Sequence, residues 1–200
     1  MKKFIGDLSR ADAELLESYA QTATTVLEFG VGGSTQIIAQ AIPDHALFWS
    51  LETDPAWIST TFDKLCKLRV EHKCQFHRYD EWMAEEAEAS SFDLIFDDGI
   101  ADLRCKFAMR AFPLLTAGGA LLFHDTRRID DVRNVLDLIE VYFDEIENVA
   151  FNERVNGVSS NITAVRKKAK EPYVDWNVDE QRPSWATGIG TVPEDFWTND

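Results

Sequence analysis

Residues 26–39, Val-Leu-Glu-Phe-Gly-Val-Gly-Gly-Ser-Thr-Gln-Ile-Ile-Ala, decide the fold of this chain. The apolar, β-branched and aromatic start of this segment is typical of a buried strand. Three glycines follow, then Ser34, which can cap a helix, and then a short apolar helical pattern that ends at Ile42 and Pro43. The segment therefore predicts a strand, a tight turn and a helix whose first backbone N–H groups face a ligand site.

The glycines of this turn indicate what kind of ligand fits. Glycine permits a positive φ, and its missing side chain lets a ligand come against the backbone. Turns of this kind serve dinucleotides and S-adenosylmethionine alike, so the turn indicates an adenosyl ligand and no more. Thr35 stands where the third glycine of the Gly-x-Gly-x-x-Gly pattern would be, so a strand-turn-helix without a ligand is the alternative.

The composition indicates one globular domain and excludes several kinds of partner. The 200 residues are 45% hydrophobic and 28% charged, which is typical of a folded domain. The formal net charge of -15 argues against a broad nucleic-acid contact, because phosphates would be repelled. It does not oppose a small cationic ligand in a local pocket.

Cysteine usage and the start of the chain predict a cytoplasmic protein. Cys66, Cys74 and Cys105 are odd in number and lack the spacing of metal ligands, which favours reduced thiols. No apolar run approaches the roughly 20 residues that cross a bilayer, and residues 1–7 do not read as a signal peptide. We therefore expect no membrane contact.

Strands and helices are predicted to alternate along the chain. The predicted strands are residues 26–29, 46–51, 74–80, 92–96, 120–123, 146–152 and 162–166. The predicted helices start at or near Ser9, Ser34, Asp54, Leu103 and Asp130, with Asp130 as a cap, a helical connection at 81–89 and a turn at 117–119. Asn156-Gly157 is a strong hairpin signal. This order predicts an α/β fold: a doubly wound, mostly parallel seven-stranded sheet with an antiparallel edge hairpin.

The chain is predicted to consist of one domain, residues 1–168, and a C-terminal extension, residues 169–200. The extension contains prolines and Trp176, Trp185 and Trp197, but no clear periodicity. Free tails are poor in large aromatic residues, so we expect the extension to dock, either on its own domain or on a second subunit of a homodimer.

Polar residues stand at the carboxyl ends of the first five predicted strands, where ligands bind in an open parallel sheet. These residues are Glu28, Glu52, Asp80, Asp97, Asp98, His124 and Asp125. Each has a structural alternative: a helix cap for Glu52, a turn cap for Asp80, a hydrogen-bonded core histidine for His124. Asp97 and Asp98 are adjacent, so only one of them is expected to point directly over the pocket. Arg127 and Arg128 are interpreted as surface charges, with contact to an acidic substrate as the alternative.

The charge of these residues distinguishes between the two adenosyl ligands. A dinucleotide would bring two phosphate charges to the glycine turn, where Glu28, Asp97 and Asp98 oppose them. S-adenosylmethionine brings a sulfonium and an ammonium, both cationic, which the same carboxylates favour. The sign of the charge therefore favours the methyl donor.

Three segments together resemble the class I S-adenosylmethionine-dependent methyltransferases: residues 26–32, 92–99 and 113–125. The resemblance covers roughly residues 10 to 168, and the pair His124-Asp125 is similar to the small-molecule O-methyltransferase-like branch. It implies that Glu28, Gly30 and Gly32 hold the methionine part of the donor beside Ser34 at the helix start. It further implies that Glu52 holds the ribose, that Asp80 lies on the adenine side, and that Asp97 or Asp98 stands beside the transferred methyl.

The metal-dependent members of that superfamily place two acids and an amide around a divalent cation. Asp98 and Asp125 match the acids, but Thr126 stands where the amide is expected. A hydroxyl is a poorer ligand than an amide oxygen, so bound Mg²⁺ is not favoured.

The sequence thus predicts methyl transfer from S-adenosylmethionine to a small-molecule acceptor by in-line displacement. An oxygen acceptor needs a base, and the candidates are Asp98, His124 and Asp125. A non-catalytic S-adenosylmethionine-binding or scaffolding protein is the alternative. A nicotinamide-dependent oxidoreductase is disfavoured by Thr35, by the acids after the strands and by the final hairpin. The sequence does not identify the acceptor.

Overall fold

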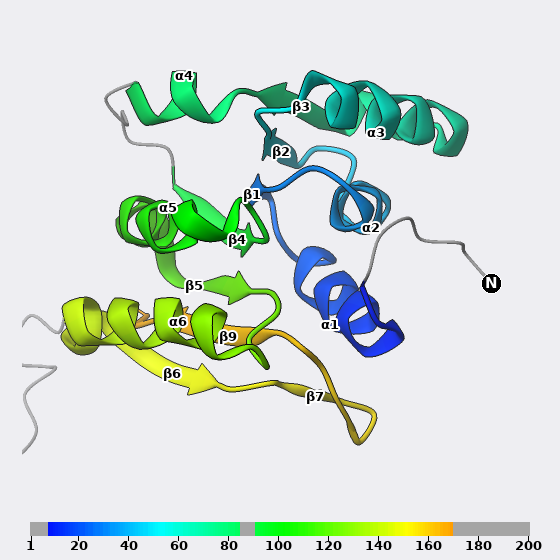
Figure 1. Ribbon diagram of the computed structural model, residues 1–200. Coiled ribbons are helices and arrows are strands. Elements are labelled where there is room, and N and C mark those ends of the chain that lie inside the picture. The colour runs from blue at the N-terminus through cyan, green and yellow to red at the C-terminus, as the bar shows by residue number, and fades with distance from the viewer. Residues whose placement is uncertain (1–7, 85–90, 170–200) are drawn as a thin grey trace, which may run out of the picture. The chain divides into compact units, whose positions relative to one another are not determined.

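Figure 1 shows the computed structural model, which describes residues 8–84 and 91–169. Within these residues, seven strands form one sheet in the order β3-β2-β1-β4-β5-β9-β6, and β7 pairs with β8. The strands are β1 (Thr25–Phe29), β2 (Leu47–Leu51), β3 (Cys74–His77), β4 (Phe92–Asp97), β5 (Leu115–Phe123), β6 (Ile146–Ala150), β7 (Arg154–Val155), β8 (Val158–Ser159) and β9 (Thr163–Lys167). The predicted α/β fold is confirmed.

Helices cover both faces of the sheet (Figure 1). The helices are α1 (Arg10–Ala20), α2 (Gly33–Ala41), α3 (Pro55–Leu68), α4 (Tyr79–Ala84), α5 (Arg104–Ala111) and α6 (Ile129–Tyr142). Leu16 of α1 and Ile38 of α2 pack in one apolar cluster, and Phe107 of α5 and Val135 of α6 pack in another. Because both faces are covered, the strands are rich in fully buried apolar residues.

The direction of the strands follows the prediction. β1 runs parallel to β2 and β4, whereas β9 runs antiparallel to both β5 and β6. The connection from β6 to β9 contains the β7–β8 hairpin, in which Asn156 and Gly157 both have positive φ values, 50° and 81°. Such values are typical of a tight hairpin turn, so the signal at these two residues was correct.

The predicted turn at residues 117–119 is wrong, because β5 continues through it from Leu115. Gly118 has a positive φ of 82°, which departs from regular strand conformation, and the pairing with β4 shifts register between Phe92 and Leu94. At Gly119 a Cβ atom would lie 3.1 Å from the Asp93 carbonyl oxygen. The two glycines therefore permit a close, irregular pairing at the start of the strand rather than a reversal of the chain.

Two predicted boundaries also differ. Arg128, not Asp130, is the N-cap residue of α6, and Asp130 lies in the first helical turn, where it pairs with Arg133 at 3.2 Å. The third strand ends at His77, so Asp80 belongs to the first turn of α4 and not to the end of a strand. Helix boundaries depend on capping contacts that composition leaves open.

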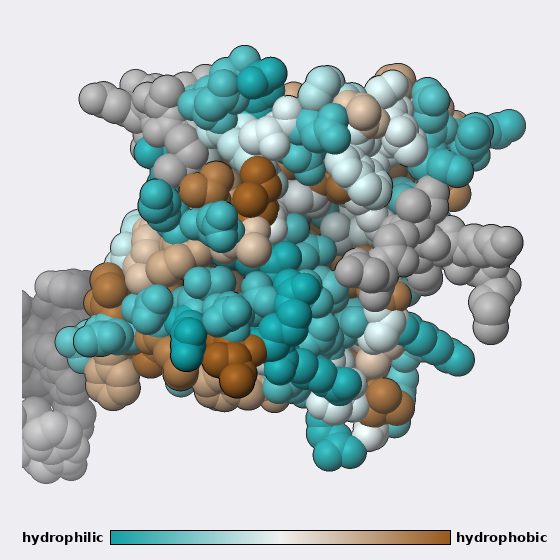
Figure 2. Space-filling view, in the orientation of Figure 1, coloured by the Kyte–Doolittle hydropathy of each residue, from teal (hydrophilic) through white to brown (hydrophobic). Residues whose placement is uncertain are grey.

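The surface is mostly hydrophilic in the view of Figure 2, with apolar atoms gathered over the region of α6. Large apolar side chains that are exposed on this helix include Ile129, Leu136 and Val141. Among residues 8–84 and 91–169, no helix is both long and apolar enough to cross a membrane. The predicted extension from 169 lies, apart from its first residue, outside the described residues, as do residues 85–89 of the helical connection.

Candidate active site

The turn after β1 lies against the backbone that follows β4. The Gly30 N–H donates to the Leu51 carbonyl at 3.0 Å, and the Asp98 N–H donates to the Phe29 carbonyl at 2.9 Å. Gly30 has a φ of 96°, and a Cβ atom there would collide with the Asp98 carbonyl oxygen. Only glycine both adopts this positive φ readily and leaves room for the Asp98 carbonyl oxygen. Gly30 therefore allows the turn after β1 to pack against the residues after β4.

A cleft of about 140 Å³ opens above the turn. We call it the glycine-turn cleft; its lining includes Gly30, Gly32, Ser34, Glu52, Trp57 and Asp98. A Cβ atom at Gly32 would meet no atom within 4 Å, so the backbone of the turn borders open space on this side. The structure thus brings four of the predicted cofactor-binding positions and one predicted catalytic position to the same cleft.

Glu28 lies buried beneath the turn and is linked to it through Thr35. Glu28 Oε2 accepts hydrogen bonds from the Thr35 hydroxyl at 2.7 Å and from Ser50, and the Thr35 oxygen accepts from the Gly32 N–H at 2.8 Å. The other oxygen, Oε1, has no hydrogen-bond partner in the described part of the chain. Burial raises the pKa of Glu28 to about 7, against the lowering effect of the hydroxyl donors.

Thr35, counted above as a departure from the glycine pattern, is therefore what ties the buried acid to the turn. A glycine at this position would supply no hydroxyl. Its position one turn into α2, at the place of the third glycine, was the only signal in the sequence that could have revealed this link.

Glu52 is held at the cleft by backbone donors. Its Oε2 accepts from the Val31 N–H of the glycine turn at 3.3 Å, and its Oε1 accepts from the Thr53 N–H at 2.7 Å and the Asp54 N–H at 3.1 Å. The carboxylate is half-buried and lines the cleft. It is not a helix cap, because Asp54 is the N-cap residue of α3.

Asp97 and Asp98 occupy different environments. Asp97 is fully buried, its Oδ1 accepts a long hydrogen bond from the Gly99 N–H at 3.4 Å, and its Oδ2 lacks a hydrogen-bond partner among the described residues. Burial raises the pKa of Asp97 to about 8, although Arg104 opposes this. Asp98 lines the cleft with 22% of its side chain exposed. Of the two, Asp98 is the one that faces the cleft.

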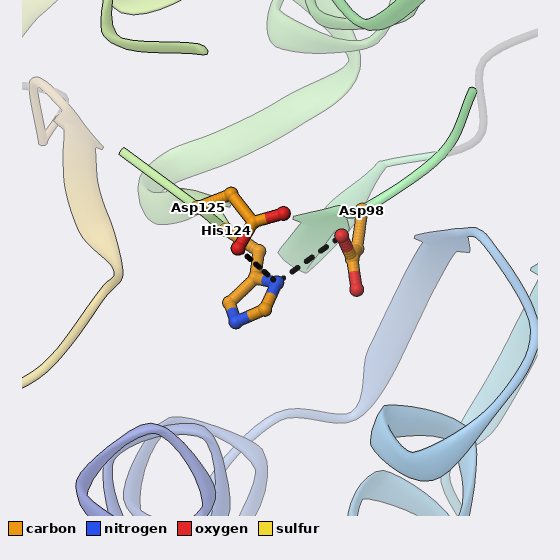
Figure 3. Close-up of side chains that lie close together, drawn as sticks. All are labelled: Asp98, His124 and Asp125. Carbon is orange, nitrogen blue, oxygen red and sulfur yellow. Dashed lines mark ion pairs between the residues drawn. The ribbon is translucent and has the colours of Figure 1, made fainter. Parts of the chain in front are cut away.

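His124 lies between carboxylates (Figure 3). Its Nδ1 is 3.2 Å from Asp98 Oδ1 and 3.6 Å from Asp125 Oδ1, and its Nε2 is 3.7 Å from Asp12 Oδ2. The ring is 2% exposed. Burial lowers the pKa of His124, but the neighbouring carboxylates outweigh burial and raise it to about 10. An imidazole that is already protonated at neutral pH cannot accept a proton there.

Asp125 has a left-handed backbone conformation, with a φ of 62°, and is the second residue after β5. Its Oδ1 accepts from the Asn161 side-chain amide at 2.9 Å, and its Oδ2 pairs with Arg128. Arg128, interpreted above as surface charge, therefore contacts a predicted site residue, whereas Arg127 donates to the Ser159 carbonyl.

Arg104 of α5 is the site residue that the sequence analysis missed. Its guanidinium is buried and donates to Asp98 and to Asp131, each at 2.8 Å, and to the carbonyl oxygens of Gly99 and His124. A signal did exist. Arg104 occupies the apolar stripe of α5, one turn before Phe107, where a cation is unexpected unless acids meet it.

A divalent cation fits this arrangement poorly. Asp98, His124 and Asp125 each offer a ligand atom, and these atoms lie within 4.8 Å of one another. The carboxylates, however, already contact Arg104, whose charge would repel a metal ion, and Mg²⁺ prefers oxygen to a ring nitrogen. Thr126, at the place of the expected amide, instead accepts from the Thr163 hydroxyl at 2.8 Å.

Asp80 is one of the predicted site residues that do not line the glycine-turn cleft. It is exposed and pairs with Arg78 at 3.0 Å. It does not contribute to the lining of the cleft, so its assignment to the adenine side stays a prediction.

Solved structures share this fold, although no protein-family model and no curated protein matches the sequence. The O-methyltransferase TomG from Streptomyces achromogenes, in complex with SAM, is 16% identical with a TM-score of 0.63, over 82% of each chain. An O-methyltransferase from Bacillus cereus in complex with SAH is 17% identical with a TM-score of 0.63, over 80% of this chain and 83% of that one. The SAH-bound methyltransferase PaMTH1 from Podospora anserina is 18% identical with a TM-score of 0.60, over 80% and 79%. At such identities the likeness establishes the fold, which is that of class I S-adenosylmethionine-dependent O-methyltransferases.

Proposed function

We propose that this protein transfers a methyl group from S-adenosylmethionine to an oxygen of a small-molecule acceptor. The observation that carries the proposal is the glycine-turn cleft, which combines open backbone at Gly32 with the carboxylates of Glu52 and Asp98. Proteins of this fold that were crystallised with SAM or SAH support it. The acceptor class is inferred from this likeness and from the presence of a candidate base.

The residues present fit a cationic adenosyl ligand. Two buried carboxylate oxygens, Glu28 Oε1 and Asp97 Oδ2, have no hydrogen-bond partner in the described chain. Neither residue lines the glycine-turn cleft, so the fit rests on the carboxylates that do, Glu52 and Asp98, and these favour a cationic ligand. A nicotinamide dinucleotide would bring two phosphate charges against the same carboxylates.

The parts of the ligand are assigned by position. Gly30, Gly32 and Ser34 would hold its methionine part, Glu52 would accept hydrogen bonds from the ribose hydroxyls, and Asp80 would lie on the adenine side. When bound, the donor supplies a methyl group on a sulfonium, which a nucleophile displaces in line. Positioning an acceptor at attack distance from that methyl group can lower the barrier by several kcal/mol.

Asp98 is the proposed base. It faces the cleft, and its Oδ1 receives the Arg104 guanidinium at 2.8 Å, which fixes the carboxylate while its second oxygen remains for an acceptor hydroxyl. His124 and Asp125 would act on Asp98 rather than on the acceptor, because His124 is buried and Asp125 is engaged by Asn161 and Arg128. The predicted location of the protein is the cytoplasm, where S-adenosylmethionine would be available to it.

Calorimetric titration of the purified protein with SAM, SAH and NADH tests the proposal. We expect saturable binding of SAM and SAH and none of NADH. Glu52→Gln should weaken SAH binding at least tenfold, because a charge-assisted hydrogen bond to the ribose is lost. Asp54→Asn is the matched control: it removes the same charge two residues away, outside the lining of the cleft.

The outcomes separate the alternatives. Failure of SAM and SAH to bind refutes the proposal, and saturable NADH binding would favour an oxidoreductase. Asp98→Asn should keep SAH affinity and lose methyl transfer, measured as SAH formation with a panel of hydroxylated acceptors. If SAH binds but the wild-type protein forms no SAH with any acceptor, the protein is a non-catalytic binding protein, and methyl transfer that survives in Asp98→Asn excludes Asp98 as the base.

A further inference from the structure

Asp12 of α1 has more contacts than its position in a helix cap requires. Its Oδ2 accepts from the Ser9 N–H at 2.8 Å, which completes a capping box with the Ser9 hydroxyl, and its Oδ1 accepts from the Asn161 N–H. Residues in the first turn of a helix are commonly exposed, yet Asp12 is 1% exposed. The buried carboxylate faces His124 at 3.7 Å, a contact that capping does not need.

The His124 imidazole connects Asp12 to Asp98. Carboxylates approach it from α1 on its Nε2 side and from the residues after β4 and β5, Asp98 and Asp125, on its Nδ1 side. Arg104 approaches only its backbone carbonyl. Neither ring nitrogen has a hydrogen bond of ordinary geometry within the described chain, so charge rather than hydrogen bonding holds the ring. A buried imidazolium needs such anions to offset the loss of water.

We infer that Asp12 is a positioning residue of the proposed active site, which acts through the buried His124 ring to hold the Asp98 side chain toward the glycine-turn cleft. The inference rests on the proposed function. It links three elements that are far apart in sequence: α1, the end of β4 and the end of β5. If Asp12 served only to cap α1, its replacement would not affect Asp98.

The physical reason is electrostatic. Asp12 supplies the negative charge that stabilises the His124 imidazolium on the side away from the cleft, and the raised pKa of His124 accords with this. Without that charge the ring becomes neutral more readily, and Asp98 keeps only Arg104 as a cationic neighbour. The Asp98 carboxylate then loses one of the two contacts that fix its Oδ1.

The test compares Asp12→Asn with Ser9→Ala. Both variants weaken the same capping box, but only Asp12→Asn removes the charge opposite His124. For Asp12→Asn we expect kcat to fall at least tenfold while KM for SAM changes less than threefold. The ¹⁵N spectrum of the His124 ring at pH 7.5 should change from the protonated to the neutral form. Ser9→Ala should leave the spectrum and kcat within twofold of wild type, and Asp12→Glu, which keeps the charge, should restore most of kcat.

Several results would overturn the inference. These are an unchanged His124 spectrum in Asp12→Asn, an equal loss of kcat in Ser9→Ala, or a loss confined to KM. If Asp12→Asn does not fold, an NMR titration of the wild-type protein replaces it. The chemical shift of the Asp12 carboxyl carbon must then change at the pH at which the His124 ring loses its proton. The spectra do not depend on methyl transfer, so a protein that fails to bind SAM refutes the proposed function while His124 is still tested.

Discussion

Glu28 and Asp98 show how differently two acids of one site are used. Glu28 is buried and bound by hydroxyl donors, so its environment favours the protonated form. Asp98 lies at the cleft and is paired with Arg104. The two acids thus differ in environment: burial favours the protonated form of Glu28, whereas Asp98 lies at the cleft beside a cation.

The glycines of the turn allow a prediction at this scale. Gly30→Ala should lower the free energy of unfolding by more than about 2 kcal/mol, because the new Cβ collides with the Asp98 carbonyl at a positive φ. Gly32→Val should change it by less than about 1 kcal/mol, since its Cβ meets no atom within 4 Å. Urea denaturation measures both.

Gly32→Val, the variant with the smaller loss of stability, should nevertheless lose ligand affinity. The Gly32→Val side chain projects into the glycine-turn cleft and should weaken SAH binding more than tenfold in a protein that remains folded. Equal loss of stability in both variants would contradict the described turn geometry.

At the scale of elements, α5 connects β4, β5 and α6 through Arg104. The guanidinium reaches Asp98 after β4, the His124 carbonyl after β5, and Asp131 in α6. Arg128 also pairs with Asp131, at 2.6 Å, so the beginning of α6 is anchored by two cations. The site is therefore assembled by a network between elements and not by any one loop.

Loss of the Arg104 side chain from this network should lower the stability of the protein. Arg104→Gln should lower the free energy of unfolding by about 3–5 kcal/mol, because it removes a buried cation from Asp131, which keeps only Arg128, and from Asp98, which keeps only His124. Arg133→Gln, which breaks the exposed pair with Asp130, is the control and should cost about 0–1 kcal/mol. Urea denaturation of both variants at pH 7 gives the comparison, and similar losses would mean that the buried network is not intact in solution.

For the whole molecule, buried groups determine how stability varies with pH. The pKa values of Glu28, Asp97 and His124 are all raised, to about 7, 8 and 10. A group whose pKa is higher in the folded than in the unfolded protein stabilises the folded state at pH values below its unfolded pKa. This stabilisation is lost as the pH rises through its folded pKa. The pKa of Asp12 is lowered, since hydrogen bonds outweigh burial, and its contribution is lost in acid.

We therefore expect the free energy of unfolding to fall steadily as the pH rises from about 5 to 10. Glu28→Gln should remove the part of this fall between about pH 5 and 7, and stabilise the protein by roughly 1–3 kcal/mol at pH 8. Thermal denaturation across this pH range measures the effect. Glu140→Gln, an exposed glutamate of α6, should leave the profile unchanged, and a wild-type profile that rises with pH would refute the burial of these acids.

Much of the fold could be predicted because its signals are local. The glycine turn after β1, the apolar strands and the Asn156-Gly157 hairpin each depend on a few adjacent residues. The predictions for the start of β5 and for the N-cap of α6 were wrong, because Gly118 and Asp130 are compatible with more than one local structure. Long-range pairing decided between them.

The sequence by itself determined the alternation of strands and helices, the glycine turn and the acids that follow the strands, since periodicity and turn chemistry are properties of short segments. Only the tertiary structure decided that Asp98 rather than Asp97 faces the cleft, that Arg104 lies among the carboxylates, and that Asp12 meets His124. These contacts join residues distant in sequence, and their charge and burial exist only once the sheet has brought the ends of its strands together.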